Sequence, residues 1–204
     1  MSGMKTNYQL LCDEQIKKLT ADGHIPKLLL QSCCGPCSTY VLEYLSKYFE
    51  VTVLFYNPNI YPPEEYEKRL CAQREVVSKL RVDHPLNLIY EDYDHSEFLD
   101  AAEGLENEPE GGARCIECFR LRLKKTAEIA KALKVDCFTT TLTVSPHKNA
   151  EILNSLGKKI SEEVGIPFLF ADFKKREGYK RSIELSRELE IYRQEYCGCE
   201  FSAK

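Results

Sequence analysis

The chain has 204 residues, of which 43% are hydrophobic, and it carries ten cysteines and a formal net charge of −4. This length suits one folded domain with a sizeable core, and no apolar run reaches the ~18 residues that a membrane helix requires. The N-terminus lacks the apolar segment of a secretory signal. We therefore expect a cytoplasmic protein without a membrane partner, in a compartment where structural disulfides are rare.

Short apolar runs alternate with longer amphipathic stretches along the chain, which is typical of a parallel α/β sheet. The predicted strands cover residues 27–32, 51–56, 86–90, 136–141 and 167–170. The predicted helices cover residues 38–49, 64–80, 95–105, 114–133, 149–164 and 179–196. The pattern indicates a single-domain, Rossmann-like α/β fold, with a parallel sheet of about five strands flanked by helices. We assign residues 26–204 to this catalytic domain and residues 1–25 to an N-terminal extension that we expect to be helical.

The first cysteine cluster follows the first predicted strand directly, as Cys33-Cys34-Gly-Pro-Cys37. Ligands of such sheets bind beyond the carboxyl ends of the strands. A phosphate-binding loop at this place needs several glycines for close backbone approach, and this turn has one. The sequence therefore disfavours nucleotide binding and predicts a metal site at the carboxyl edge of the sheet.

A second cluster, Cys115-x-x-Cys118, stands at the start of a predicted helix. Its spacing lets two thiolates reach one ion or one face of a cluster, and a helix N-terminus lowers the pKa of a thiol. The adjacent side chains of Cys33 and Cys34 diverge, so they suit different irons of a cluster better than one ion. These four thiolates would satisfy a [4Fe–4S] cluster. A Cys₄ zinc site with the same ligands is the alternative that spacing leaves open.

The third cluster is Cys197-Gly-Cys199. Two thiols at this spacing can close a small, strained disulfide of the labile, catalytic kind, or they can add two further metal ligands. Cys37 could be a fifth ligand, a ligand to a second metal or a thiol at a helix start. The three remaining cysteines stand alone and are expected to be small buried hydrophobes: Cys12, Cys71 and Cys137.

The charge is unevenly distributed, because residues 91–110 carry nine acidic side chains and no Lys or Arg. The rest of the chain has 28 basic and 23 acidic residues. The densest basic run could contact a phosphate backbone, or it could be a solvated helix start. It consists of Lys174, Lys175, Arg176, Lys180 and Arg181.

Other polar and aromatic residues follow the predicted strands at the same sheet edge. His147 and its neighbour Lys148 follow the fourth strand, where the histidine could act as a general acid or phosphate contact; solvent exposure is the alternative. Tyr56, Asn57 and Asn59 follow the second strand and could stack on and hydrogen-bond a nucleobase. Packing in the core or in a turn explains these three residues equally well.

Six ordered motifs together resemble the cobalamin-independent epoxyqueuosine reductase family (QueH), over about residues 28–202. They are Cys33-Cys34-x-Pro36-Cys37, Phe55-Tyr-Asn57-Pro-Asn59-Ile, Cys115-x-x-Cys118-Phe-x-x-Arg122, Phe138-Thr-Thr-Thr-Leu, Ser145-Pro-x-Lys148 and Tyr196-Cys-Gly-Cys199. The resemblance implies the last step of queuosine synthesis, in which epoxyqueuosine at the wobble position of a tRNA anticodon is reduced to the alkene with loss of water. The physiological electron donor is unidentified.

The resemblance also implies a set of cofactors and site residues. A [4Fe–4S] cluster would be held by Cys33, Cys34, Cys115 and Cys118, and a redox-active pair would be formed by Cys197 and Cys199. Some members of the family carry Asp at the position of Cys37 and an additional mononuclear iron beside the cluster. Two other classes of function use the same residues: a zinc-stabilised binding module, and a thiol oxidoreductase that acts on proteins through Cys197 and Cys199.

Overall fold

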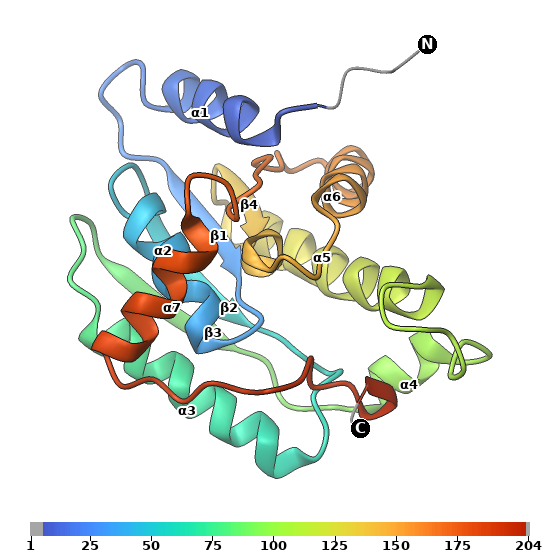
Figure 1. Ribbon diagram of the computed structural model, residues 1–204. Helices are drawn as coiled ribbons and strands as arrows, with labels where there is room; N and C mark the ends of the chain where they lie inside the picture. The colour runs from blue at the N-terminus through green and yellow to red at the C-terminus, as the bar shows by residue number, and fades with distance from the viewer. Residues whose placement is uncertain (1–5, 203–204) are drawn as a thin grey trace.

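The computed structural model describes residues 6–202; the first five residues of the predicted N-terminal extension and the last two of the predicted domain lie outside this part. The chain folds as an α/β protein around a parallel sheet in the order β3-β2-β1-β4, which confirms the predicted fold class (Figure 1). The sheet has four strands instead of five. They are β1 (Lys27–Gln31), β2 (Glu50–Phe55), β3 (Leu86–Tyr90) and β4 (Cys137–Thr140).

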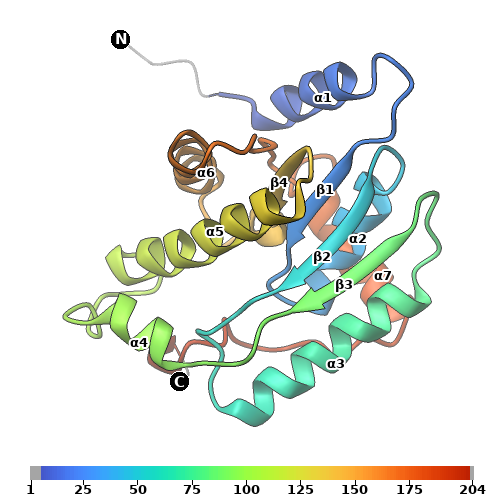
Figure 2. The same cartoon turned by 180° about the vertical axis from the view of Figure 1, so that it is seen from behind.

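Helices cover both faces of the sheet (Figures 1 and 2). One face is covered by α2 (Gly35–Leu45), α3 (Pro63–Lys79) and α7 (Gly178–Glu188). The other is covered by α5 (Ala113–Leu133) and α6 (Ala150–Val164). The short α4 (Ser96–Ala102) follows β3 and packs on α5, and two 3₁₀ turns span Thr141–Val144 and Glu200–Ser202.

The core forms on both faces because successive side chains of a strand point to opposite sides. Leu28 and Leu30 of β1 belong to the cluster under α2 and α3, whereas Leu29 between them belongs to the cluster under α5 and α6. All three are fully buried. A near-continuous apolar run is what a parallel strand covered on both faces requires.

Helix α1 (Tyr8–Leu19) packs on this same core. Its side chains Cys12 and Ile16 are buried in the cluster that also contains Leu28. Gln15 donates to the carbonyl oxygen of Phe168 (3.1 Å) and so ties the helix to the segment after α6. The asparagine that precedes α1, Asn7, caps its first turn.

The predicted strand over residues 167–170 is wrong, because only one residue of it pairs. Phe168 forms an isolated parallel bridge with Phe138 of β4. The backbone N–H of Phe170 donates to the side-chain oxygen of Gln15 (2.9 Å), and that of Ala171 donates to the side-chain oxygen of Asn154 (3.0 Å). Side chains from elsewhere in the chain therefore satisfy groups that a strand ladder would have used.

The predicted last helix, residues 179–196, is also too long. Helix α7 ends at Glu188, and Glu190 has a left-handed backbone with a φ of 54°. From there the chain runs in an extended path beside α3 toward α4 (Figures 1 and 2). This path delivers residues 197–199 to the carboxyl edge of the sheet.

Candidate metal and redox centre

The first cysteine cluster lies in the turn between β1 and α2. The sulfur atoms of Cys33, Cys34 and Cys37 all lie within 4.8 Å of one another, and those of Cys33 and Cys34 are 3.7 Å apart. Pro36 stands in the first turn of α2, where a missing N–H costs nothing. The three thiols therefore gather at a helix N-terminus, which favours negative charge.

A buried glutamine fixes the strand ends beneath this turn. The Gln31 side chain donates to the Tyr56 carbonyl (3.2 Å) at the end of β2 and accepts from the Thr140 hydroxyl (2.7 Å) at the end of β4. The hydroxyl of the following residue, Thr141, accepts from the backbone N–H of Cys33 (3.1 Å) and donates to the sulfur of the same cysteine (3.3 Å). Three strand ends thus hold the position of one cysteine.

Positive charge and thiol contacts act together on the first cluster. Interactions with the thiols of Cys34 and Cys37 hold the pKa of Cys33 well below its usual value, against the effect of burial and with help from the charges of Lys148 and Arg122. Burial raises the pKa of Cys34 to about 12. Of the three thiols, Cys33 is therefore the one that ionises first.

Arg122 is buried, with 2% of its surface exposed, and its guanidinium donates to the Asn57 side-chain oxygen (2.6 Å). Asn57 in turn donates to the carbonyl oxygen of Ser32 (2.9 Å), beside the first cluster. The guanidinium also contacts the Cys118 thiol, and a buried charge held only by neutral groups is costly. It is compensated when the neighbouring thiols carry negative charge.

The second cluster lies at the start of α5. The backbone N–H of Gly111 donates to the Cys115 sulfur (3.2 Å), and burial raises the pKa of Cys118 to about 12. Both thiols line a cavity of about 30 Å³ together with Cys197 and Cys199 of the third cluster. Neither belongs to the compact group that Cys33, Cys34 and Cys37 form.

The three cysteine segments converge on two neighbouring hollows. The larger is a cleft of about 1290 Å³ whose walls include Cys33, Cys37 and Cys197. It shares several residues with the smaller cavity: Asn59, Glu110, His147, Lys148 and Cys197. Soft thiolate sulfur is the ligand type that zinc and iron–sulfur clusters prefer, so the donor set fits either cofactor.

The residues after β2 divide into two groups. Tyr56 and Asn57 are buried and bonded within the protein, the tyrosine hydroxyl to Glu97 and the asparagine as described above. Asn59 lines both hollows, and its buried side-chain oxygen has no hydrogen-bond partner within residues 6–202. Among the three, Asn59 is the side chain that faces the site with an unused polar atom.

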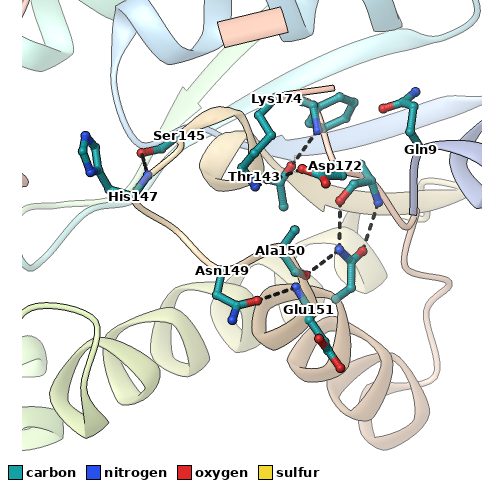
Figure 3. Close-up of polar contacts among 12 residues, drawn as sticks. Gln9, Thr143, Ser145, His147, Asn149, Ala150, Glu151, Asp172 and Lys174 are labelled. Carbon is teal, nitrogen blue, oxygen red and sulfur yellow. Dashed lines mark hydrogen bonds and ion pairs between the residues drawn. The ribbon is translucent and has the colours of Figure 1, made fainter. Parts of the chain in front are cut away.

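The predicted phosphate contacts border a third cavity, of about 650 Å³, beside the N-terminus of α6 (Figure 3). His147 is exposed and Lys148 half-buried, and both line it together with Lys174 and Lys175. Lys174 pairs with Asp172 (2.9 Å). The lining of this cavity thus combines several basic side chains with a carboxylate that is already paired.

The remaining residues of the basic run differ in their partners. Arg176 pairs with Asp13 (2.5 Å), and Arg181 pairs with Glu43 (2.7 Å). Lys175 and Lys180 are exposed and form no ion pair with any residue in the described range 6–202.

Sequence reasoning missed Arg69, and it named Arg122 and Thr141 only as members of motifs, without a role in the site. Arg122 stands four residues after Cys118 on the same helix face, which was a usable signal. Arg69 lines the large cleft but sits in a strongly charged helix, and nothing in its neighbours marks it as buried. The expected burial of lone cysteines is confirmed for Cys12 and Cys137; it is wrong for Cys71, which is exposed on α3.

Within residues 6–202, no helix combines the length and the apolar character needed to cross a membrane. The family model for epoxyqueuosine reductase QueH matches residues 28–204. Relatives with the same name are 41% identical over 202 residues in Streptococcus pyogenes serotype M1 (98% of this chain, 79% of the relative) and 41% identical over 207 residues in Staphylococcus epidermidis (100% and 87%). A third, from Thermotoga maritima, is 39% identical over 181 residues (86% and 89%).

These matches cover nearly the whole chain and include all three cysteine clusters. They confirm the resemblance that the ordered motifs indicated. The chain belongs to the epoxyqueuosine reductase QueH family.

Proposed function

We propose that this protein reduces epoxyqueuosine to queuosine in the anticodon of tRNA, and that the α/β domain of residues 26–204 carries the activity. Besides the family, the observation that carries the proposal is the meeting of three cysteine clusters beside an open cleft of about 1290 Å³. A cleft of this size accommodates a modified base flipped out of a nucleic acid strand. A tRNA substrate places the reaction in the cytoplasm.

In this proposal Cys33, Cys34, Cys115 and Cys118 hold a [4Fe–4S] cluster, which when bound supplies electrons one at a time. Cys37 lies within reach of two of these sulfurs and could ligate an additional iron. Anaerobically purified protein should contain about four irons and four acid-labile sulfides per chain. Stoichiometric zinc without sulfide, after growth with ample iron, would instead support the zinc-stabilised binding module.

The electron count of the reaction matches the third cluster. Removal of the epoxide oxygen as water consumes two electrons and two protons. Oxidation of the Cys197 and Cys199 thiols to one disulfide releases two of each, and the unidentified donor then restores the dithiol. These cysteines line the hollow that also contains Lys148 and Asn59, so the substrate oxygen could reach a cation and an amide while the thiols react.

Single substitutions test the role of the dithiol. Cys197→Ser and Cys199→Ser should each abolish reduction of tRNA that bears epoxyqueuosine, while the visible spectrum of the cluster stays unchanged. Cys71→Ser is the matched control, because that thiol is exposed on α3. Full activity in both site variants would refute the dithiol role. Disulfide exchange with proteins but no turnover of the tRNA would favour the protein thiol oxidoreductase.

The basic side chains that border the site would hold tRNA phosphates. Lys175 and Lys180 carry exposed charges, so replacing both with Gln should weaken tRNA binding and reduce the slope of log K against log salt by roughly 0.7 per lost contact. Lys47→Gln is the control, since this exposed lysine follows the far end of α2. Unchanged binding and slope in the double variant would remove the phosphate contacts from the proposal.

A further inference from the structure

The C-terminal segment that carries Cys197 runs beside α3 (Figure 2), and a buried arginine of that helix donates hydrogen bonds to it. Arg69 is 1% exposed, and its guanidinium donates to the carbonyl oxygens of Cys197 (2.9 Å) and Tyr196 (3.3 Å). Its third contact is an ion pair with Glu65, one helical turn earlier (2.7 Å). The same carboxylate accepts from the hydroxyl of Tyr192 (3.1 and 3.0 Å). The Arg69–Glu65 ion pair therefore bonds to the C-terminal segment at three residues: Tyr192, Tyr196 and Cys197.

The glycine between the two cysteines allows the backbone to approach the Arg69 guanidinium closely. Gly198 has a φ of 111°, which L side chains rarely adopt, and a Cβ there would lie 2.8 Å from the Arg69 guanidinium. The Gly198 carbonyl also accepts from the backbone N–H of Tyr61 (2.8 Å). The backbone can pass this close to the guanidinium because the residue has no side chain.

The next turn of α3 contacts the segment of the first cysteine cluster through hydrogen bonds. Gln73 is fully buried, and its side-chain oxygen accepts from the hydroxyls of Ser32 (2.6 Å) and Ser38 (3.1 Å). These two serines flank the segment Cys33-Cys34-Gly-Pro-Cys37. Residues 65, 69 and 73 are each four apart, so they share one face of the helix, and each step of four residues advances about 6 Å along the axis.

We propose that this stripe of α3, formed by Glu65, Arg69 and Gln73, fixes the Cys197–Cys199 pair relative to the first cysteine cluster. Arg69 is the positioning residue of the redox pair, and Gln73 is that of the cluster turn. The inference rests on the redox role that the proposed function gives to the pair. A rigid helix that contacts both segments sets the separation of the two thiol groups in the reduced, dithiol state.

Arg69, its ion pair with Glu65 and its two hydrogen bonds to the carbonyls of Tyr196 and Cys197 form a clamp on the C-terminal segment. The clamp holds the conformation in which the Cys197 and Cys199 thiols are free. In a glutathione redox buffer, Cys197 and Cys199 each lose one proton and one electron to form the disulfide bond, and glutathione disulfide is reduced to two glutathione thiols. In this proposal the contacts of Arg69 hold the backbone path of the dithiol, so a backbone shift that closes the small Cys-Gly-Cys ring works against them. Arg69 therefore stabilises the dithiol, and its loss favours the disulfide.

The test is the ratio of disulfide to dithiol at Cys197–Cys199 in the full-length, anaerobically purified protein, equilibrated with glutathione buffers and read by alkylation and peptide mass spectrometry. Arg69→Gln should raise this ratio about tenfold at a fixed buffer, which for a two-electron couple is a change of about 30 mV. Arg74→Gln is the matched control, because Arg74 lies on the same helix but is exposed over the ring of Tyr90. It should leave the ratio unchanged.

Arg69→Gln leaves Glu65 buried without its partner and could fail to fold. The double variant Glu65→Gln/Arg69→Gln, which leaves no unpaired charge, should then show the same rise. A ratio within twofold of the parent, a fall in the ratio or an equal rise in Arg74→Gln would overturn the proposal. The ratio is read without tRNA, so the clamp is testable even if the parent protein does not reduce epoxyqueuosine, a result that would refute the proposed function alone.

Discussion

Substitution of Gly198 by alanine tests how tightly the Cys-Gly-Cys turn is built. The residue has a φ of 111°, and an added Cβ would lie 2.8 Å from the Arg69 guanidinium and 3.1 Å from the Ile60 side chain. A residue in such a backbone region costs roughly 1–3 kcal/mol. Overpacking against a buried group adds about 1–3 kcal/mol. We therefore expect Gly198→Ala to destabilise the closed turn by at least ~2 kcal/mol.

The turn can relieve this strain by opening, and Cys199 reports the opening because only 7% of its surface is exposed. A cost of ~2 kcal/mol raises the open population about 30-fold, given that 1.4 kcal/mol is a factor of ten. The assay is the initial rate at which iodoacetamide alkylates Cys199 in the native protein, read by peptide mass spectrometry. The rate should rise by roughly 30-fold.

Gly104→Ala provides the control for this measurement. Gly104 also has a positive φ, 74°, but nothing lies within 4 Å of its added Cβ. It should cost some overall stability and leave Cys199 protected. An alkylation rate in Gly198→Ala within twofold of the parent, or an equal increase in Gly104→Ala, would refute the reasoning that the guanidinium contact closes the turn.

Three further predictions concern stability. Gly157→Ala should lower the free energy of unfolding in urea by about 1–2 kcal/mol, because the added Cβ would lie 2.5 Å from the ring of Phe168 and this overlap costs more than the helix propensity of alanine contributes. Adding Phe168→Leu should recover most of the loss. A single variant more stable than the parent would contradict the overlap. Asn57→Leu should cost about 2–3 kcal/mol in the same assay, since the buried Arg122 loses its acceptor; an unchanged midpoint would show that the pair contributes nothing. Burial raises the pKa of Cys12 from 9.0 to about 12, so its contribution is complete below pH 9 and is lost as the pH rises toward 12. Cys12→Ala should flatten the alkaline fall in stability by up to ~1.4 kcal/mol per pH unit, and an equally steep fall would rule out this thiol as its cause.

The fold was predictable to the extent that it depends on local patterns. Strand β1 reads as a continuous apolar run because both faces are covered, and α6 ends at Val164, just before Gly165 with its left-handed backbone. The predictions failed where distant side chains decide the outcome. Residues 167–170 look like a strand, but side chains take the backbone groups beyond the bridge at Phe168. The Thr139 hydroxyl donates to the Leu169 carbonyl, and Gln15 and Asn154 accept from the N–H groups of Phe170 and Ala171.

The cysteines of the candidate site could be recognised from the sequence, whereas the burial and contacts of its arginines could not. Cysteines are scarce, and their spacing alone suggests shared chemistry, so the three clusters could be recognised without a structure. An arginine in a charged helix gives no such signal, because its burial depends on which backbone later packs over it. Arg69 is buried where the C-terminal segment, 128 residues further on, passes α3 and accepts its hydrogen bonds.

The segment that resembles a fifth strand also determines how the sheet meets its surroundings. It lies along the outer side of β4, and the Gln15 side chain bonds both the Phe168 carbonyl and the Phe170 N–H, so these groups are not open to another strand. The opposite margin, β3, is the other end of the sheet and is only partly buried. Strand edges of this kind are the places where chains associate during refolding. Self-association of partly folded chains should therefore proceed through β3, whose short length and preceding Pro85 limit it.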